Sequence, residues 1–139
     1  MNFSEQLQEI SNHLNALVRH AASSENLSFA QAQLLLVIPS EGISMTNLAD
    51  SLGIDTSTLS RNVKKLEQFS LIYRKRDSID SRIFNIFLSN TGEDVVDLLY
   101  SHLDEKNTQI LKLIPLEAQK RIGDVLEQIN WAFTQFREK

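Results

Sequence analysis

Apolar residues recur at alternating steps of three and four positions at both ends of the chain, and this pattern limits the fold more than any other feature. Near the N-terminus the series is Phe3, Leu7, Ile10, Leu14 and Leu17. Near the C-terminus it is Ile122, Leu126, Ile129, Phe133 and Phe136. Such spacing puts apolar side chains on one narrow face of an amphipathic α-helix. We therefore expect a long helix at each end.

A third long helix is expected between Val96 and Leu113, where the spacing recurs and Lys106 breaks one position. Pro115 separates it from the last helix, because proline can open a helix but is not tolerated inside one. The 139 residues include only four glycines and two prolines, whereas an all-β fold uses many such residues in turns. The expected fold class is mainly α, in one domain.

Two interpretations of the terminal helices remain open. They form either a bundle core within one chain or the interface of a homodimer. We favour the homodimer, because the helices extend beyond what a small central module can cover and aromatic residues crowd the last turns. The expected dimerisation residues are Phe3, Leu7, Ile10, Ile122, Leu126, Ile129, Phe133 and Phe136.

The middle of the chain predicts three shorter helices. The first covers residues 29–38. Ser44 can cap the second, which ends at Gly53, a residue suited to the left-handed turn after a helix. Asp55 or Thr56 can cap the third.

A β-hairpin follows, and after it the long helix that contains Val96 to Leu113. Residues 71–76 and 83–88 are β-rich runs separated by six mostly polar residues, which predicts two paired strands. Asn90 with Glu93, or Ser89 alone, can then cap the next helix.

Two helices joined at a glycine and followed by a hairpin have the order of a winged helix-turn-helix. The spacing of Ala49, Gly53 and Leu59 fits this motif, with a small residue where the helices cross, a turn glycine and a buried apolar residue. The spacing alone has many false positives, and the hairpin at the right distance strengthens it. The expected framework residues are Ser44, Ala49, Gly53 and Leu59.

The second helix of this motif has an apolar face and a basic face. At 100° per residue, Leu59, Val63 and Leu66 fall within about 60° of each other, and no carboxylate lies opposite them. A helix of about twelve residues fits the major groove of DNA, where arginine can read guanine and lysines can bind phosphates. The alternative is a solvated basic face without a partner. The residues expected to contact DNA are Ser57, Thr58, Ser60, Arg61, Lys64 and Lys65.

The charge distribution supports the DNA interpretation. The net charge of −4 and the isoelectric point near 5.3 argue against a nucleic-acid partner when taken alone. From Arg61 to Arg82, however, seven basic and three acidic residues give +4, which leaves −8 for the rest of the chain. We interpret the chain as an acidic body with one basic surface for double-stranded DNA.

The expected hairpin brings a second group of cations, on or beside its loop, where a cation can enter the minor groove. They are Arg74, Lys75, Arg76 and Arg82. Asp80 can pair with Arg82 and fix the direction of its guanidinium. The expected DNA-binding residues of the wing are Arg74, Arg76, Asp80 and Arg82.

The stretch from Ser44 to Gly92 resembles the MarR/SlyA family of bacterial winged helix-turn-helix transcriptional regulators. The resemblance lies in SMTNLADSLGIDTSTLSRNVKKLEQ, in the strand entry LIYRKR, in DSR at residues 80–82 and in LSNTG at residues 88–92, where Ser89 replaces the usual threonine. The flanking helices match the family layout too. The resemblance implies one domain over residues 1–139, with the winged helix-turn-helix at 28–90 and helical dimerisation parts at 1–22 and 91–139.

The resemblance also implies a function. A homodimer would bind adjacent half-sites of a pseudo-palindromic operator as a repressor, with Arg82 in the minor groove and Asp80 positioning it. A small aromatic or anionic effector would release the DNA. Helical spacing and the family layout place the candidate effector pocket at His13, Leu17, His20, Phe29 and Gln33.

Two departures from the family pattern stand out. Ser70 occupies the position before the first wing strand where the family usually has glycine, and this predicts either strain in the turn or a longer turn. Asp77 and Asp80 add negative charge at the ends of the wing loop, which predicts a modest grip on the minor groove.

Several classes of function are disfavoured. There is no cysteine, which excludes disulfides, thiolate metal sites and thiol switches. His13 and His20 lie about 10.5 Å apart along a helix, too far to share a metal, so we expect no metal and no cofactor. The chain has no glycine-rich phosphate loop and no catalytic triad pattern, so we do not expect an enzyme.

The expected location is the cytoplasm, without a membrane partner. The longest apolar run, Leu34 to Ile38, is too short to span a bilayer, and the first twenty residues do not form a secretory signal. Two other functions remain as alternatives: a winged-helix module that binds protein, and a metal-responsive winged-helix repressor.

Overall fold

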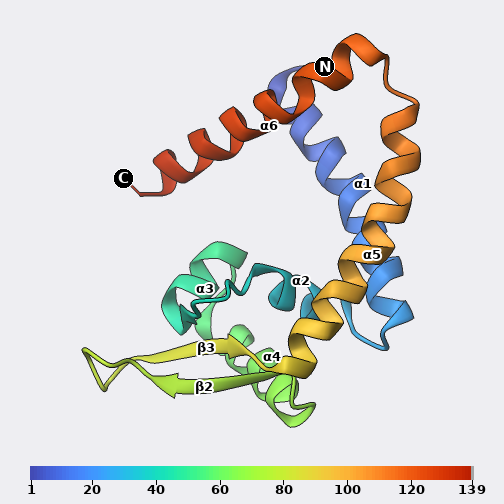
Figure 1. Ribbon diagram of the computed structural model, residues 1–139. Helices are drawn as coiled ribbons and strands as arrows, with labels where there is room; N and C mark the ends of the chain where they lie inside the picture. Colours follow the sequence, from blue (N-terminus) through green and yellow to red (C-terminus); the bar gives the residue numbers. More distant parts are fainter. Residues whose placement is uncertain (139) are drawn as a thin grey trace. The chain divides into compact units, whose positions relative to one another are not determined.

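The computed structural model describes residues 1–138 and confirms a mainly helical fold with a small wing (Figure 1). The elements follow the expected order, with one additional strand. They are α1 (Phe3–Ser24), α2 (Phe29–Val37), β1 (Ile43–Ser44), α3 (Met45–Leu52), α4 (Thr56–Gln68), β2 (Ile72–Arg76), β3 (Phe84–Leu88), α5 (Asn90–Lys112) and α6 (Leu116–Arg137). The described chain divides into two compact units, one from Met1 to Leu103 and one from Asp104 onward.

Helices α1 to α5 begin where short polar side chains satisfy the first free N–H groups, whereas α6 begins after Pro115 without a side-chain cap. Ser44 caps α3 by accepting the Asn47 N–H at 3.2 Å. Of the two alternatives for α4, Asp55 is the cap, and Thr56 is the first helical residue. Ser89 caps α5, because its Oγ accepts the Gly92 N–H at 2.9 Å.

The sheet has three antiparallel strands in the order β1–β3–β2. Each hairpin strand starts one residue later than expected, and Ile72 lies opposite Leu88 at the base of the hairpin. The short strand β1 was not expected from the sequence; it pairs Ile43 with Ile86 and Ser44 with Asn85. The expected two-stranded hairpin is therefore the larger part of a three-stranded sheet.

The main core lies where α2, α3, α4 and the sheet meet. Its buried residues are Leu34, Leu35, Ile38, Leu48, Ala49, Leu59, Val63, Leu66, Leu71, Ile72 and Ile86. A smaller cluster joins α1, α2 and the first half of α5 through Ala21, Ala22, Ala32 and Leu99. These two clusters hold the helix-turn-helix and the base of the hairpin in one unit.

The second unit contains the end of α5 and the whole of α6. Pro115 precedes α6, as expected. The side-chain nitrogen of Gln119 donates to the carbonyls of Leu111 at 3.0 Å and Ile114 at 2.7 Å. Gln119, in the first turn of α6, is thus tied to the last turn of α5 and to the link between the two helices; the Leu111 carbonyl also accepts the Ile114 N–H at 3.0 Å. No residue of α6, all of which is described, is buried within the chain.

Candidate nucleic-acid interface

The turn between α3 and α4 sets the position of the candidate recognition helix. Gly53 adopts the left-handed conformation at φ 65°, and its N–H donates to the Asp50 carbonyl at 3.2 Å. A side chain at this glycine would meet nothing within 4 Å. Glycine is therefore suited to this position by its backbone conformation rather than by lack of space.

Helix α4 has the two faces that its sequence predicts. Leu59, Val63 and Leu66 are completely buried. The polar side chains that face solvent are Thr56, Ser57, Ser60, Arg61, Lys64, Lys65 and Gln68. Burial of the three apolar side chains fixes the rotation of the helix, and so its basic face stays outward.

Thr58 differs from the other expected contact residues of α4 because it is half-buried and already hydrogen-bonded. Its N–H and hydroxyl donate to the two carboxylate oxygens of Asp55, at 2.7 and 3.1 Å. These bonds lower the pKa of the Asp55 carboxyl. Thr58 therefore helps to form the start of α4, and only the acceptor capacity of its hydroxyl is left for a ligand.

Arg74 and Arg76 lie on β2 and have partners within the protein. Arg74 binds Glu67 of α4 through Nε at 3.0 Å and Nη2 at 2.8 Å. Arg76 donates to the Ser81 carbonyl at 2.6 Å, and its guanidinium carbon lies 4.6 Å from the centre of the Phe84 ring. Arg74 is thus in the middle of a strand and tied to α4, rather than beside the loop as expected.

The loop between β2 and β3 lies at the free tip of the hairpin, at the end opposite the start of α5 (Figure 1). There Arg82 donates to both carboxylate oxygens of Asp80, through Nε and Nη2, each at 3.0 Å. The Arg82 side chain is nevertheless 89% exposed. This ion pair lowers the pKa of Asp80 and raises that of Arg82. The hypothesised pairing is present in the structure.

Residues 61–82 present unpaired positive charge to solvent, because their carboxylates already bind partners within the protein. Each of the three carboxylates between residues 61 and 82 has a partner within the protein; they are Glu67, Asp77 and Asp80. Four cationic side chains, in contrast, make no hydrogen bond or ion pair within residues 1–138. They are Arg61, Lys64, Lys65 and Lys75. Such a surface suits a polyanion.

Asp77 has a structural role that its negative charge alone does not predict. Its carboxylate accepts three hydrogen bonds from the loop and from β3. An aspartate that starts a polar loop is a known signal for a turn in which the side chain binds the backbone two residues on. That signal is present in the sequence at Asp77 and Ile79.

The candidate effector residues lie on α1 and α2. Leu17, Phe29 and Gln33 are half-buried, whereas His13 and His20 are exposed. His13 lies 3.9 Å from the Glu9 carboxylate. The Phe29 ring lies 4.1 Å from the guanidinium carbon of Arg19, a cation that the sequence analysis did not include.

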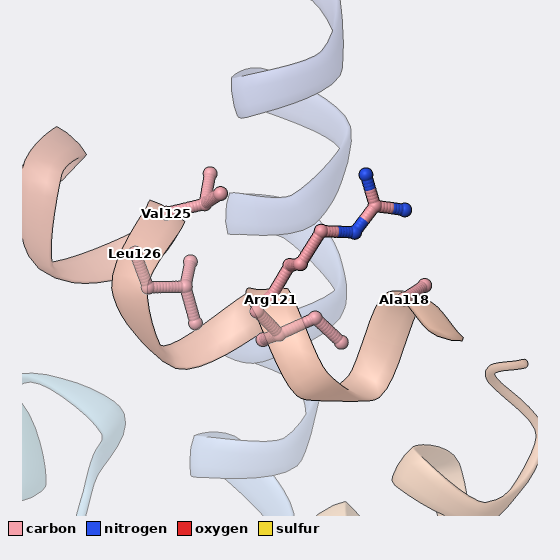
Figure 2. Close-up of a pocket in the computed structure, with 5 residues that line it drawn as sticks. Ala118, Arg121, Val125 and Leu126 are labelled. Carbon is pink, nitrogen blue, oxygen red and sulfur yellow. The ribbon is translucent and has the colours of Figure 1, made fainter. Parts of the chain in front are cut away.

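The expected dimerisation residues are partly or largely exposed in the single chain. Leu7, Ile122 and Ile129 are half-buried. The exposed ones are Phe3, Ile10, Leu126, Phe133 and Phe136. A shallow pocket on α6 is lined by Ala118, Arg121, Ile122, Val125 and Leu126, and only Arg121 brings a polar group to it (Figure 2).

The described residues contain neither a membrane-spanning helix nor a cluster of metal ligands. No helix there is long and apolar enough to cross a membrane. No group of three or more histidine, aspartate or glutamate side chains in residues 1–138 is arranged to hold a metal ion.

Comparisons with known proteins give concordant matches. Residues 25–83 match the sequence model of the MarR family. An uncharacterised HTH-type transcriptional regulator of Bacillus subtilis, YxaD, is 33% identical over 62% of this chain and 60% of its own length. The match therefore spans less than two thirds of that relative.

Two staphylococcal proteins extend the comparison. The HTH-type transcriptional regulator MgrA of Staphylococcus aureus is 29% identical over 82% of this chain and 77% of its own. A crystal structure of S. aureus MepR in complex with DNA has the same fold, with a TM-score of 0.69 and 21% identity. That match covers 95% of this chain and 98% of the MepR chain.

Proposed function

We propose that the chain is a member of the MarR family and a sequence-specific, DNA-binding transcriptional regulator, with support from the match of residues 25–83 to the family model and from the 33% identity to an HTH-type regulator. The observation that carries the proposal is the exposed face of α4, where Arg61, Lys64 and Lys65 have no carboxylate partner within residues 1–138. Support comes from MepR, a protein of the same fold that has been crystallised with DNA.

In this proposal α4 enters the major groove. Arg61 reads a base edge, since arginine can donate two hydrogen bonds to guanine, and the lysines bind phosphates. Ser57, Ser60 and Thr58 supply hydroxyl groups near the start of the helix. The wing brings Arg82, held by Asp80, to the neighbouring minor groove. Arg76 donates to the wing loop at the Ser81 carbonyl, and Arg74 links β2 to α4.

We further propose that the protein acts as a homodimeric repressor on a pseudo-palindromic operator. Support comes from α6, where Leu126 and Phe136 are 52% and 78% exposed in the single chain. Large exposed apolar side chains on one helix mark an interaction surface. A symmetric dimer predicts two half-sites about one helical turn apart, roughly 10 base pairs.

Selection of bound duplexes from a random DNA library tests the proposal directly. We expect the purified protein to enrich an inverted repeat and to bind it with an affinity that falls steeply as salt rises, because phosphate contacts release counterions. Failure to enrich any duplex at low salt, or binding without salt dependence, would contradict the proposal.

Two variants of α4 separate base reading from phosphate binding. Arg61→Ala should reduce discrimination between the selected duplex and a scrambled one by about 1–3 kcal/mol. Lys65→Ala should weaken both duplexes alike and reduce the salt slope by about one. Lys120→Ala is the matched control, because Lys120 is exposed on α6 about 160° around the helix from Ile122, and it should leave both quantities unchanged.

An effector site at His13, Leu17, His20, Phe29 and Gln33 completes the proposal. Arg19 supports an anionic aromatic ligand, because its guanidinium already lies over the Phe29 ring. The test is a panel of small aromatic carboxylic acids added to the protein–duplex complex, with aliphatic acids as controls. At least one aromatic acid should release the DNA, and Arg19→Ala should abolish that release. No effect of the whole panel would argue against this ligand class.

A further inference from the structure

The loop at the tip of the wing is organised by the side chain of Asp77. Its Oδ2 accepts the main-chain N–H of Ile79 at 3.0 Å and that of Asp80 at 2.9 Å. Its Oδ1 accepts the side-chain amide of Asn85 at 3.0 Å, and its own N–H donates to the Ile83 carbonyl at 2.8 Å. One residue thus joins the outgoing strand, the tip of the loop and the returning strand.

Further hydrogen bonds connect this loop to Arg82. The N–H of Asp80 is one of the groups that Asp77 holds, and the Asp80 carboxylate in turn accepts the main-chain N–H of Arg82 at 3.1 Å and its guanidinium. The Arg82 side chain makes no other hydrogen bond or ion pair within residues 1–138. The direction of the exposed guanidinium therefore depends on Asp80, whose position depends on Asp77.

We propose that Asp77 is a positioning residue for DNA binding: it holds the wing tip in the conformation in which Asp80 presents Arg82 to the minor groove. This inference rests on the proposed function. It gives Asp77 a role opposite to the one its charge suggests, because a carboxylate near a DNA surface repels phosphates. Fixing a side chain before binding reduces the entropy lost when the complex forms.

Charge and geometry predict opposite effects when Asp77 is replaced. If its charge dominates, Asp77→Ala removes repulsion and strengthens DNA binding. If its hydrogen bonds dominate, Asp77→Ala frees the loop and weakens binding. Asp77→Asn separates the two effects, because an asparagine oxygen can still accept the two main-chain N–H groups while the charge is absent.

The experiment measures affinity for a duplex recovered by the wild-type protein from a random library. We expect Asp77→Ala to bind about three- to tenfold more weakly and Asp77→Asn to bind at least as tightly as the wild type. Ser78→Ala is the matched control, since the Ser78 side chain makes no hydrogen bond within the described chain. It should not change the affinity.

A double-variant cycle tests whether Asp77 acts through Arg82. Arg82→Ala should weaken binding at least as much as Asp77→Ala, and the double variant should bind like Arg82→Ala alone, because residues in one network are not additive. Additive losses would overturn the inference, as would an Asp77→Ala protein that binds as tightly as the wild type or tighter.

NMR without DNA supplies a second readout and checks folding. In Asp77→Ala the Arg82 Nε–H signal should move toward its value in a flexible chain, while the amide signals of α4 stay in place. In Asp77→Asn the Arg82 signal and the α4 signals should both resemble those of the wild type. An unchanged Arg82 signal in Asp77→Ala overturns the inference while leaving the proposed function intact. A wild-type protein that binds no duplex overturns both.

Discussion

At the scale of single residues, Ser70 shows how one position can be strained by the path of the chain around it. It links the end of α4 to β2 in the left-handed region, at φ 60°. Its N–H donates to the Glu67 carbonyl at 2.9 Å, and its own carbonyl accepts the Ser89 hydroxyl at 2.6 Å. The turn thus requires a conformation that L-residues with a side chain rarely adopt.

Ser70→Gly is expected to stabilise the protein by about 1 kcal/mol, because glycine reaches this conformation without steric cost. Urea unfolding monitored by circular dichroism measures the change. The same substitution at Ser101, an exposed position within α5, should instead destabilise by about 0.5 kcal/mol. A Ser70→Gly protein that unfolds earlier than the wild type would show that the turn stores no strain.

The carboxylates of Asp77 and Asp80 predict how the structure of the wing tip depends on pH. The pKa of Asp77 lies below its ordinary value of 3.8, chiefly because the Asp80 N–H binds the ionised form, and the pKa of Asp80 is lowered chiefly by Arg82. A carboxyl whose pKa falls on folding contributes stability above its unfolded pKa and loses it as pH falls through the folded value.

We therefore expect the wing tip to keep its structure from about pH 8 to about pH 5 and to loosen only below the ordinary aspartate pKa. Carboxyl and amide NMR signals of Asp77, Ile79 and Asp80, followed during acidification, check this. Loss of the tip structure near pH 6 would mean that these carboxylates do not hold it.

At the scale of elements, local patterns in the sequence predicted most of the fold. The apolar periods fixed the helices, and Ser44, Gly53 and Asp55 marked their ends, because a cap needs only neighbouring residues. The strand β1 could not be found this way. It consists of two residues, and its pairing with Ile86 and Asn85 lies more than 40 positions away.

The difference between local signals and contacts between distant residues also explains which parts of the candidate interface the sequence predicts. The basic face of α4 follows from helical spacing alone, and its rotation is fixed by buried neighbours that the sequence also marks. The pairing of Arg74 with Glu67 joins two different elements, so no periodicity reveals it. The turn at Asp77 and Ile79 has a local signal in the sequence, whereas the bond from Asn85 of β3 to Asp77 spans eight positions and appears only once the hairpin is folded.

The contact between the start of α5 and the start of β2 leaves no space for a side chain. A Cβ added to Gly92 would overlap the carbonyl oxygen of Leu71, which also accepts the Ser89 N–H at 3.0 Å. Gly92→Ala should therefore destabilise the protein by about 3 kcal/mol, because backbone has to shift. Thermal and urea unfolding measure the loss.

Gly123→Ala is the matched control for that substitution. Gly123 lies within α6 and has open space around the position of a Cβ. Alanine there should stabilise the helix by up to about 1 kcal/mol. If Gly92→Ala and Gly123→Ala change the free energy of unfolding in the same direction, overlap with the Leu71 carbonyl does not explain the effect at Gly92.

At the scale of the whole molecule, the exposed apolar residues of α6 make the oligomeric state a direct test. The chain has a mass of 15.9 kDa, and we expect light scattering to give twice that value at micromolar concentration. Leu126→Asp should weaken the dimer about ten- to a hundredfold, because a leucine buried at an interface contributes about 1.5–3 kcal/mol.

Gln128→Asp introduces the same charge on the opposite side of α6, about 200° around the helix. It should leave the dimer intact. A wild-type protein that remains a monomer throughout, or a Leu126→Asp protein that dimerises as tightly as the wild type, would exclude α6 as the interface.

The strand order has a consequence for solubility. β3 is paired on both sides, by β1 and β2, so β2 is an edge strand whose outer backbone groups are open to another strand. Edge strands of this kind can recruit a further chain and start aggregation, and charged side chains on the strand discourage it. β2 carries Arg74, Lys75 and Arg76 in succession. The positive charge that suits the wing for a polyanion therefore also repels the same strand of another copy, and this protects a folded but unbound protein from aggregating through its wing.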